Sequence, residues 1–145
     1  MEKRVSARAI IVNDNEVLTM FRRKKKDDGS FKEYYVMPGG GVEDGESLEQ
    51  TVIRELKEEY NVDIKIVGYL GCEEREKTLG HMFHCEIVSG VPTLGGPELD
   101  RCSEDNYYEI RRVSVNDLDN IDIDGKEFIL KAVRGEYEVT DAKNR

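Results

Sequence analysis

The sequence lacks tryptophan, has only two histidines, and contains no long apolar run. No stretch approaches the roughly 18 apolar residues that a membrane-spanning helix needs, and no apolar block follows the charged start of the chain. We therefore expect a cytoplasmic protein without a membrane partner. His81 and His84 are three apart in a strand-like segment, so they should face opposite ways and not share a metal.

Cysteines are also scarce. Cys72, Cys85 and Cys102 are odd in number and widely spaced, which excludes the paired spacing of a zinc site and an even disulfide framework. The chain has neither a Ser/His/Asp pattern nor a phosphate-loop lysine motif. We expect reduced, structural thiols and no nucleophilic triad.

The chain has fewer basic than acidic residues. It contains 22 Lys and Arg and 31 Asp and Glu, which gives a net charge of −9. This balance argues against a broad basic surface for nucleic acid, so no nucleic-acid partner is expected. A polyanionic small substrate would need a bound divalent cation to offset the repulsion. The 145 residues suit one globular domain, residues 1–145.

Residue periodicity predicts the main elements. Strands are expected over 5–12, 17–21, 34–36, 62–70, 82–88 and 106–115, with the first two forming a hairpin. A mobile loop is expected from Arg22 to Ser30, and another loop over 89–103. Helices are predicted over 48–60 and from about Asp124 to Arg134, the second ending at Gly135.

The helix over 48–60 has two strong signals. Ser47 and Gln50 have the form of a capping box, and apolar residues recur at helical spacing. The apolar residues of this face are Leu48, Val52, Ile53, Leu56 and Tyr60.

Three carboxylates, Glu55, Glu58 and Glu59, share one arc of this helix beside the apolar face. Glu55 and Glu59 are like charges one turn apart, and the helix C-terminus disfavours anions, at a cost of some tenths of a kcal/mol each. Arg54 can offset only part of this. A solvated charged face is the simplest alternative, but a hard cation such as Mg²⁺ or Mn²⁺ would explain the cluster better.

The glycine triplet Gly39 to Gly41 follows the strand that ends at Met37-Pro38. Glycines there can present backbone carbonyls to a metal and amides to phosphate without side-chain obstruction. Taken alone, the triplet is more typical of a turn than of a site.

Taken together, these residues resemble the Nudix box, the signature of the Nudix hydrolases. The resemblance covers residues 40–62, where eight of nine defined positions match at the family's spacing. The matching positions are Gly40, Glu46, Arg54, Glu55, Leu56, Glu58, Glu59 and Val62. The departure is Asn61, where the family has Gly; Asn is the next-best residue for a left-handed backbone, so we expect a small stability cost and an intact site.

The resemblance implies an α/β fold: a Nudix-like three-layer α/β/α sandwich with a mixed β-sheet. It also implies hydrolysis of a phosphoanhydride bond in a nucleoside diphosphate-linked or nucleoside triphosphate substrate by water attack on phosphorus. The metal ligands would be Glu58, Glu59 and the Gly39 carbonyl, with Glu55 either a ligand or the base. Glu46 would pair with Arg54 to hold the loop, and Mg²⁺, or else Mn²⁺, would be the cofactor.

Family members often supply one more carboxylate from the loop before the late strand. That comparison points to Glu104 as a catalytic residue and to Glu98 as the second choice. Arg22 and Arg23 could reach phosphates, although a solvated cationic loop is the simpler reading. Tyr35 stands where the family often has Trp, so it is a candidate substrate contact.

Two other functions stay open at this point. A Nudix-like sensor would bind a nucleotide metabolite without turnover, but it would be expected to lose the box acids that this chain keeps. An interaction domain with an acidic helix would leave the glycine loop and the Glu46/Arg54 spacing unexplained. The substrate's variable part is also open, from damaged nucleoside triphosphates to nucleotide sugars, ADP-ribose and dinucleoside polyphosphates. A homodimer is common among similar proteins.

Overall fold

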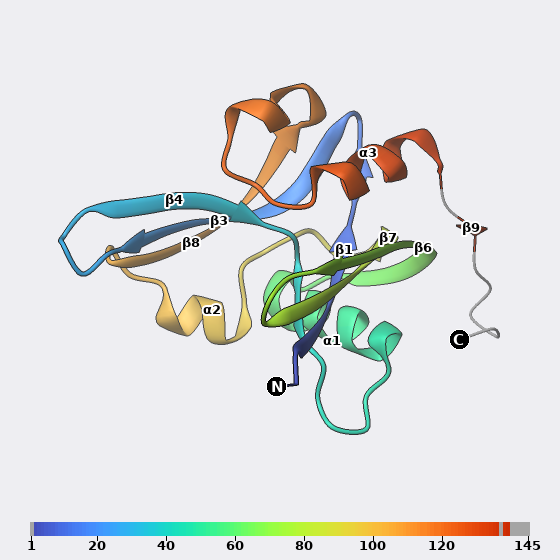
Figure 1. The fold of residues 1–145 in the computed structure, drawn as a ribbon, viewed down its shortest axis with the longest axis horizontal. Helices are drawn as coiled ribbons and strands as arrows, with labels where there is room; N and C mark the ends of the chain where they lie inside the picture. The colour runs from blue at the N-terminus through green and yellow to red at the C-terminus, as the bar shows by residue number, and fades with distance from the viewer. Residues whose placement is uncertain (1, 137, 140–145) are drawn as a thin grey trace.

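The computed structural model describes residues 2–136 and 138–139, and its first sheet is mixed (Figure 1). The strand order is β5-β1-β7-β6-β9. These strands span Gly39–Gly41 (β5), Arg4–Ile10 (β1), Thr78–Ser89 (β7), Asp63–Glu74 (β6) and Glu138–Val139 (β9). β1 and β7 run parallel, whereas the other neighbours run antiparallel.

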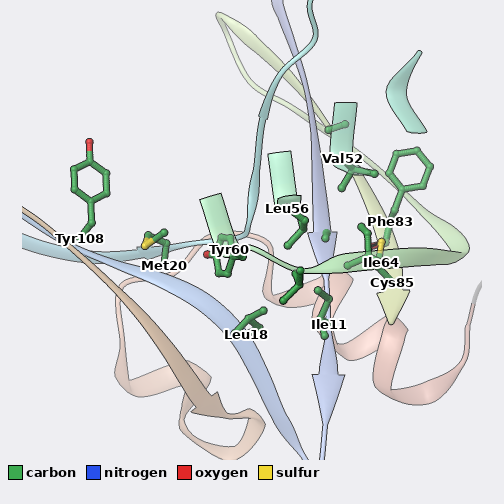
Figure 2. Close-up of a cluster of buried hydrophobic side chains, with 13 residues drawn as sticks. Ile11, Leu18, Met20, Val52, Leu56, Tyr60, Ile64, Phe83, Cys85 and Tyr108 are labelled. Carbon is green, nitrogen blue, oxygen red and sulfur yellow. Dashed lines mark hydrogen bonds between the residues drawn. The ribbon is translucent and has the colours of Figure 1, made fainter. Parts of the chain in front are cut away.

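Helices cover both faces of this sheet, so the three-layer α/β/α arrangement is confirmed (Figure 1). On one face, α1 (Leu48–Tyr60) buries Val52, Leu56 and Tyr60 against small strand residues such as Ala7 and Ala9 (Figure 2). On the other face, α3 (Lys126–Arg134) forms a second cluster around Ile129, Phe128, Met82 and Ile10. No helix in the described ranges is long and apolar enough to cross a membrane.

One member of the predicted apolar face is misplaced. Ile53 was expected among the buried residues of the helix, but it is 42% exposed. Its position on the helix lies at the margin of the apolar arc, next to the polar face. The prediction of the buried face was therefore right for Val52, Leu56 and Tyr60 and wrong for Ile53.

A second, antiparallel sheet forms an arm beside the first (Figure 1). Its strands are Val12–Asn13 (β2), Glu16–Lys25 (β3), Phe31–Val36 (β4) and Asn106–Ser114 (β8). β3 pairs with β4 on one side and with β8 on the other. A long antiparallel ribbon therefore projects from the body of the molecule.

The arm corrects the expected mobile loop over 22–30. Residues through Lys25 continue β3, and only a tight turn connects it to β4. In that turn Lys26 donates its backbone N–H to Ser30 at 2.7 Å, and Gly29 adopts a φ of 89°. The charged residues 22–25 have the composition of a loop. They form a strand because β3 is hydrogen-bonded to β4 on one side and to β8 on the other.

The expected early hairpin is right only in part. Asp14 and Asn15 form its turn with φ values of 52° and 63°, as two-residue hairpin turns require. Only the short β2 pairs with β3, because β1 pairs with β7 in the first sheet. The strand predicted over 5–12 is thus divided between the two sheets.

The ends of α1 form as the sequence predicts. The Ser47 side chain accepts the backbone N–H of Gln50 at 3.1 Å, while the Gln50 side chain accepts the N–H of Ser47 at 2.8 Å. Asn61 ends the helix with φ 57° and ψ 35°, the expected left-handed conformation. Gly135 likewise ends α3 with φ 70°.

Two short helices were not predicted. α2 (Gly96–Arg101) lies inside the expected loop over 89–103, and η1 (Val115–Asn120) is a 3-10 helix after β8. α2 has only six residues and follows glycines, so its local sequence resembles a loop. It forms where the preceding loop binds the end of α1: Gly95 donates its N–H to the Glu59 carbonyl at 2.9 Å.

Asn61 provides a test of how α1 ends. Its side chain donates to the Thr93 carbonyl at 2.8 Å, an exposed contact that the family's glycine could not make. We expect Asn61→Gly to stay close to wild-type stability, and Asn61→Ala to lose about 1 kcal/mol because alanine resists a left-handed backbone. Urea unfolding midpoints measure both. Equal losses would show that the amide contact, and not the backbone, controls stability here.

Candidate metal and phosphate site

The carboxylates of α1 face a hollow of about 500 Å³ between β5, α2 and the start of the arm. Glu55, Glu58 and Glu59 line it together with Glu98 of α2. The bare backbone of Gly39 to Gly41 forms part of its wall. One hollow thus gathers a carboxylate cluster and a glycine backbone that carries no side chains.

The glycines are required by the space around them. A Cβ at Gly39 would lie 2.3 Å from the Ala7 carbonyl oxygen, and the residue has a φ of 141°. A Cβ at Gly40 would lie 2.6 Å from a carboxylate oxygen of Glu55. Gly39 therefore lets β5 pair closely with β1, whereas Gly40 leaves room for Glu55.

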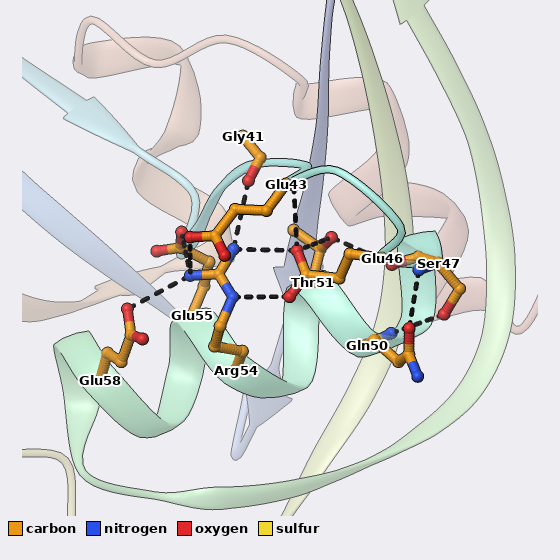
Figure 3. A network of polar contacts seen from close by, with 9 residues as sticks. All are labelled: Gly41, Glu43, Glu46, Ser47, Gln50, Thr51, Arg54, Glu55 and Glu58. Atoms are coloured by element: carbon orange, nitrogen blue, oxygen red, sulfur yellow. Dashed lines mark hydrogen bonds and ion pairs between the residues drawn. The ribbon is translucent and has the colours of Figure 1, made fainter.

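Arg54 organises the acids around it (Figure 3). Its Nε and Nη2 donate to the two oxygens of Glu46 at 2.7 and 3.0 Å. Nη1 donates to Glu55 at 3.0 Å and to Glu58 at 3.2 Å, and Nη2 reaches the Gly41 carbonyl at 3.2 Å. The expected Glu46–Arg54 pair is therefore present, and it joins the loop to the helix.

The Glu46–Arg54 pair is electrostatically strong. The hydrogen bonds from Arg54, then that from Thr51, lower the pKa of Glu46 from 4.5 to about 2. The hydrogen bonds to Glu46 raise the pKa of Arg54. Both partners stay charged over the physiological range, so the clamp does not depend on pH there.

Glu59 lies in a different environment, deeper in the hollow. Burial, a hydrogen bond with Glu55 and the charge of Glu98 raise the pKa of Glu59 from 4.5 to about 10, with Arg8 opposing the shift. The crowded acids repel one another, because burial removes the water that would separate their charges. Additional positive charge in the hollow would favour the charged form of Glu59.

A hard divalent cation suits this donor set. The ligands available are carboxylate oxygens and backbone carbonyls, and one oxygen of Glu98 is buried without a hydrogen-bond partner among the described residues. In residues 2–136 and 138–139, no three acids, histidines or cysteines already converge as metal ligands. The reason is that Glu55 and Glu58 turn toward Arg54.

Cationic side chains line the same hollow. Arg8 donates to the Met37 carbonyl at 2.8 Å, and burial lowers its pKa while the charge of Glu59 opposes that shift. Arg4, Arg22 and Arg101 also line the hollow. Arg4 and Arg8 did not feature in the sequence-based site, although their alternation with buried Ala7 along β1 marks a polar strand face.

The structure separates the remaining candidates. Glu98 lines the hollow, whereas Glu104, the preferred candidate, is exposed in the turn before β8 and does not line it. Arg22 lines the hollow, but Arg23 lies on the opposite face of the arm, 4.2 Å from the centre of the Phe31 ring. Tyr35 lines a different, adjacent hollow and packs on Phe21, with ring centres 5.2 Å apart.

Glu98 was ranked second because sequence spacing cannot place a loop acid. α2 turns it toward α1, and the loop before α2 is fixed by Thr93 donating its N–H to the Tyr60 carbonyl at 2.9 Å. A signal was available in Gly95-Gly96-Pro97, which is typical of a helix start, with Glu98 in the first turn.

Gly39 and Gly40 form a matched pair for testing the wall of the hollow. Gly39→Ala meets backbone atoms at a positive φ, so we expect a loss of about 1–3 kcal/mol or more in unfolding free energy. Gly40→Ala meets the movable end of Glu55, so stability should change far less. Chemical unfolding compares the two; an equal or larger loss for Gly40→Ala would contradict the assignment.

Acid titration tests the Glu46–Arg54 clamp. Because the folded pKa of Glu46 is about 2 and its ordinary value is 4.5, its stabilising effect is complete above pH 4.5. That effect is lost as the pH falls from 4.5 toward 2. We expect Glu46→Gln to be less stable than wild type at neutral pH, and the difference in unfolding midpoint to close in this range. Glu76→Gln, which removes an exposed acid, is the control and should show no such convergence.

Comparison with known proteins agrees with this geometry. The NUDIX domain family matches residues 2–132. An ADP-ribose pyrophosphatase from Methanocaldococcus jannaschii is 27% identical over 136 residues, covering 90% of this chain and 73% of that protein. The NAD-capped RNA hydrolase NudC of Pseudomonas aeruginosa is 42% identical over 80 residues, covering 52% of this chain but only 27% of that protein.

Solved structures show the same fold. A MutT NUDIX hydrolase from Burkholderia pseudomallei superposes with a TM-score of 0.70 at 22% identity, covering 92% of this chain and 99% of that one. A NUDIX hydrolase from Nitrosomonas europaea also reaches 0.70, at 16% identity, covering 95% of this chain and 93% of that one. With the family match over most of its length, and with Gly40, Arg54, Glu55, Glu58 and Glu59 of the box lining one hollow, this chain belongs to the Nudix family and is a Nudix pyrophosphohydrolase.

Proposed function

We propose that this chain hydrolyses a nucleoside diphosphate-linked or nucleoside triphosphate substrate with the help of Mg²⁺, or else Mn²⁺. The observation that carries the proposal is the hollow itself, where Glu55, Glu58, Glu59 and Glu98 meet a bare glycine backbone. The buried oxygen of Glu98 that has no partner in the described chain supports an additional ligand there.

Each residue has a proposed role. Glu58 and Glu59, with the carbonyl of Gly39, would hold the cation, and Glu55 would serve as a ligand or as the base. A divalent cation supplies charge neutralisation for the phosphate oxygens. We assign Glu98, in place of Glu104, the orientation of the attacking water, because Glu98 is the loop acid that lines the hollow.

The arginines would bind the phosphates. Arg8 lies beneath the glycine strand and Arg22 at the arm, so the two approach the hollow from different elements. Guanidinium groups suit phosphate oxygens, because they donate in a planar fork. Their charge would be balanced by the diphosphate and would offset the repulsion from the carboxylates.

The adjacent hollow is our proposed site for the group attached to the diphosphate. It has a volume of about 190 Å³ and shares Arg4, Arg8 and Met37 with the main hollow. Tyr35 lines it, so an aromatic ring is available beside the phosphates. ADP-ribose is the first substrate to test, because a relative that matches 90% of this chain is an ADP-ribose pyrophosphatase.

The decisive assay measures release of nucleoside monophosphate from ADP-ribose and from nucleoside triphosphates, with Mg²⁺, with Mn²⁺ and with chelator. We expect activity only with metal, and a loss of about 100-fold or more in kcat for Glu58→Gln with the fold retained by circular dichroism. Glu49→Gln, in the first turn of the same helix, is the control and should keep near-normal rates.

A thermal measurement separates catalysis from binding. Mg²⁺ should raise the unfolding temperature of the wild type, and the increase should be smaller in Glu58→Gln, since a ligand that binds only the folded state stabilises it. Binding of nucleotide without any turnover would favour a sensor instead. Near-normal turnover in Glu58→Gln would exclude the assigned role.

A further inference from the structure

One face of the arm carries cations and aromatic rings in register. In the pairing of β3 with β4, Arg22 lies opposite Tyr34, and Lys24 lies opposite Lys32. In the pairing of β3 with β8, Arg22 also lies opposite Tyr108. Residues two apart in a strand share a face, so these side chains form two successive rows. We name Arg22, Lys24, Lys32 and Tyr34 the cationic track.

Ring contacts confirm that the rows touch one another. The Arg22 guanidinium carbon lies 3.7 Å from the centre of the Tyr108 ring and 5.8 Å from that of Tyr34. The Lys32 ammonium lies 4.9 Å from the centre of the Tyr34 ring. Tyr34 therefore lies between Arg22 and the pair formed by Lys24 and Lys32.

The cationic track runs from the hollow lined by the carboxylates outward along the arm. Arg22 and Tyr34 line that hollow. Tyr34 also lines a separate, open hollow of about 410 Å³ on the arm, together with Lys24, Lys25, Lys26, Asp27 and Lys32. Because Tyr34 lines both hollows, a ligand held at the glycine strand could extend past Tyr34 toward the lysines of the arm.

Charges are sorted between the two faces of the arm. Residues 22–34 hold six Lys and Arg and three Asp and Glu, in a chain whose net charge is −9. Glu33 lies opposite Arg23 on the other face, and Asp28 accepts the backbone N–H of Ser30 at 2.9 Å within the turn. In the described parts of the chain, neither Lys24 nor Lys32 has a carboxylate within ion-pair distance.

A solvated lysine pair would need no explanation by itself. Here the pair continues a row that starts with Arg22, whose Nε is buried and has no hydrogen-bond partner among the described residues. The rest of the chain is strongly acidic and would repel a polyanion. The arm face is thus a narrow region beside the carboxylates that would attract one.

We propose that the cationic track binds phosphate groups of the substrate that lie beyond the scissile diphosphate. The inference rests on the proposed hydrolysis and specifies its substrate class. Successive rows are about 7 Å apart, so Arg22 and the Lys24/Lys32 row suit a short extended chain of phosphates. Those phosphates can come from a dinucleoside polyphosphate or from nucleotides joined to the diphosphate at the 5′ end of single-stranded RNA, whose bases could stack on Tyr34.

The test compares the double variant Lys24→Gln/Lys32→Gln with Lys65→Gln/Arg134→Gln, which removes two exposed cations far from the arm. Three substrates are used: ADP-ribose, a dinucleoside tetraphosphate, and a short RNA with a nucleotide attached at its 5′ end through a diphosphate. We expect the arm variant to raise KM about tenfold for at least one extended substrate at low salt, with kcat unchanged. ADP-ribose, which has no further phosphate, should keep its KM within about twofold.

The substrate whose KM rises identifies the source of the extra phosphates. An equal rise for ADP-ribose, no rise for any substrate, or the same rise in the Lys65/Arg134 variant would each overturn the proposal.

A binding measurement keeps the test independent of turnover. Equilibrium binding of the RNA and of the tetraphosphate to Glu58→Gln, with and without the two arm substitutions, is followed against salt concentration. Removing both lysines should lower the slope of log affinity against log salt by about 1.4 for the RNA if both contact its phosphates. If wild-type protein hydrolyses nothing with metal, the proposed function fails, while these slopes still decide the role of the track. An unchanged slope with both ligands overturns it.

Discussion

Arg54 holds together the parts of the molecule on which the site depends. Its guanidinium binds both oxygens of Glu46 from the loop, the carboxylates of Glu55 and Glu58 from its own helix, and the carbonyl of Gly41 from the short strand β5. One rigid cation thus fixes the distance between the glycine backbone and the acidic side of α1. Lysine could not replace it, because a single ammonium lacks the planar set of donors that reaches these acceptors together.

The same guanidinium divides the acids of the hollow into those that form ion pairs with it and those that do not. Arg54 attracts Glu55 and Glu58, while Glu59 and Glu98 form a second pair in which burial makes the charge of Glu59 costly. A divalent cation would compete with Arg54 for the first pair and stabilise the second. The four acids are therefore divided between a pair that contacts Arg54 and a pair that lies around the buried Glu59.

The arm extends this division of charge beyond the hollow. An alternating strand places successive residues on opposite faces, so a run of like charges in sequence becomes two different surfaces in space. Arg23 packs on Phe31 and lies opposite Glu33, whereas Arg22 and Lys24 face the side of the carboxylate hollow. A chain with a large negative charge can in this way keep a local surface for a polyanion.

Local sequence determined the elements whose signals are local. The capping box at Ser47 and Gln50, the buried Val52, Leu56 and Tyr60, the left-handed Asn61 and the box spacing all depend on residues within a few turns of one another. The acids Glu55, Glu58 and Glu59 could therefore be placed together from their helical spacing alone.

Only the tertiary structure decided the rest. It extended β3 through a charged run, since strands far along the chain pair with it, and it brought Glu98 rather than Glu104 to the hollow, since α2 docks on the end of α1. It also added Arg8, which reaches the site through the pairing of β1 with β5. Contacts between distant segments leave no periodic signal in a single sequence, and for that reason these residues could not be assigned before the fold was known.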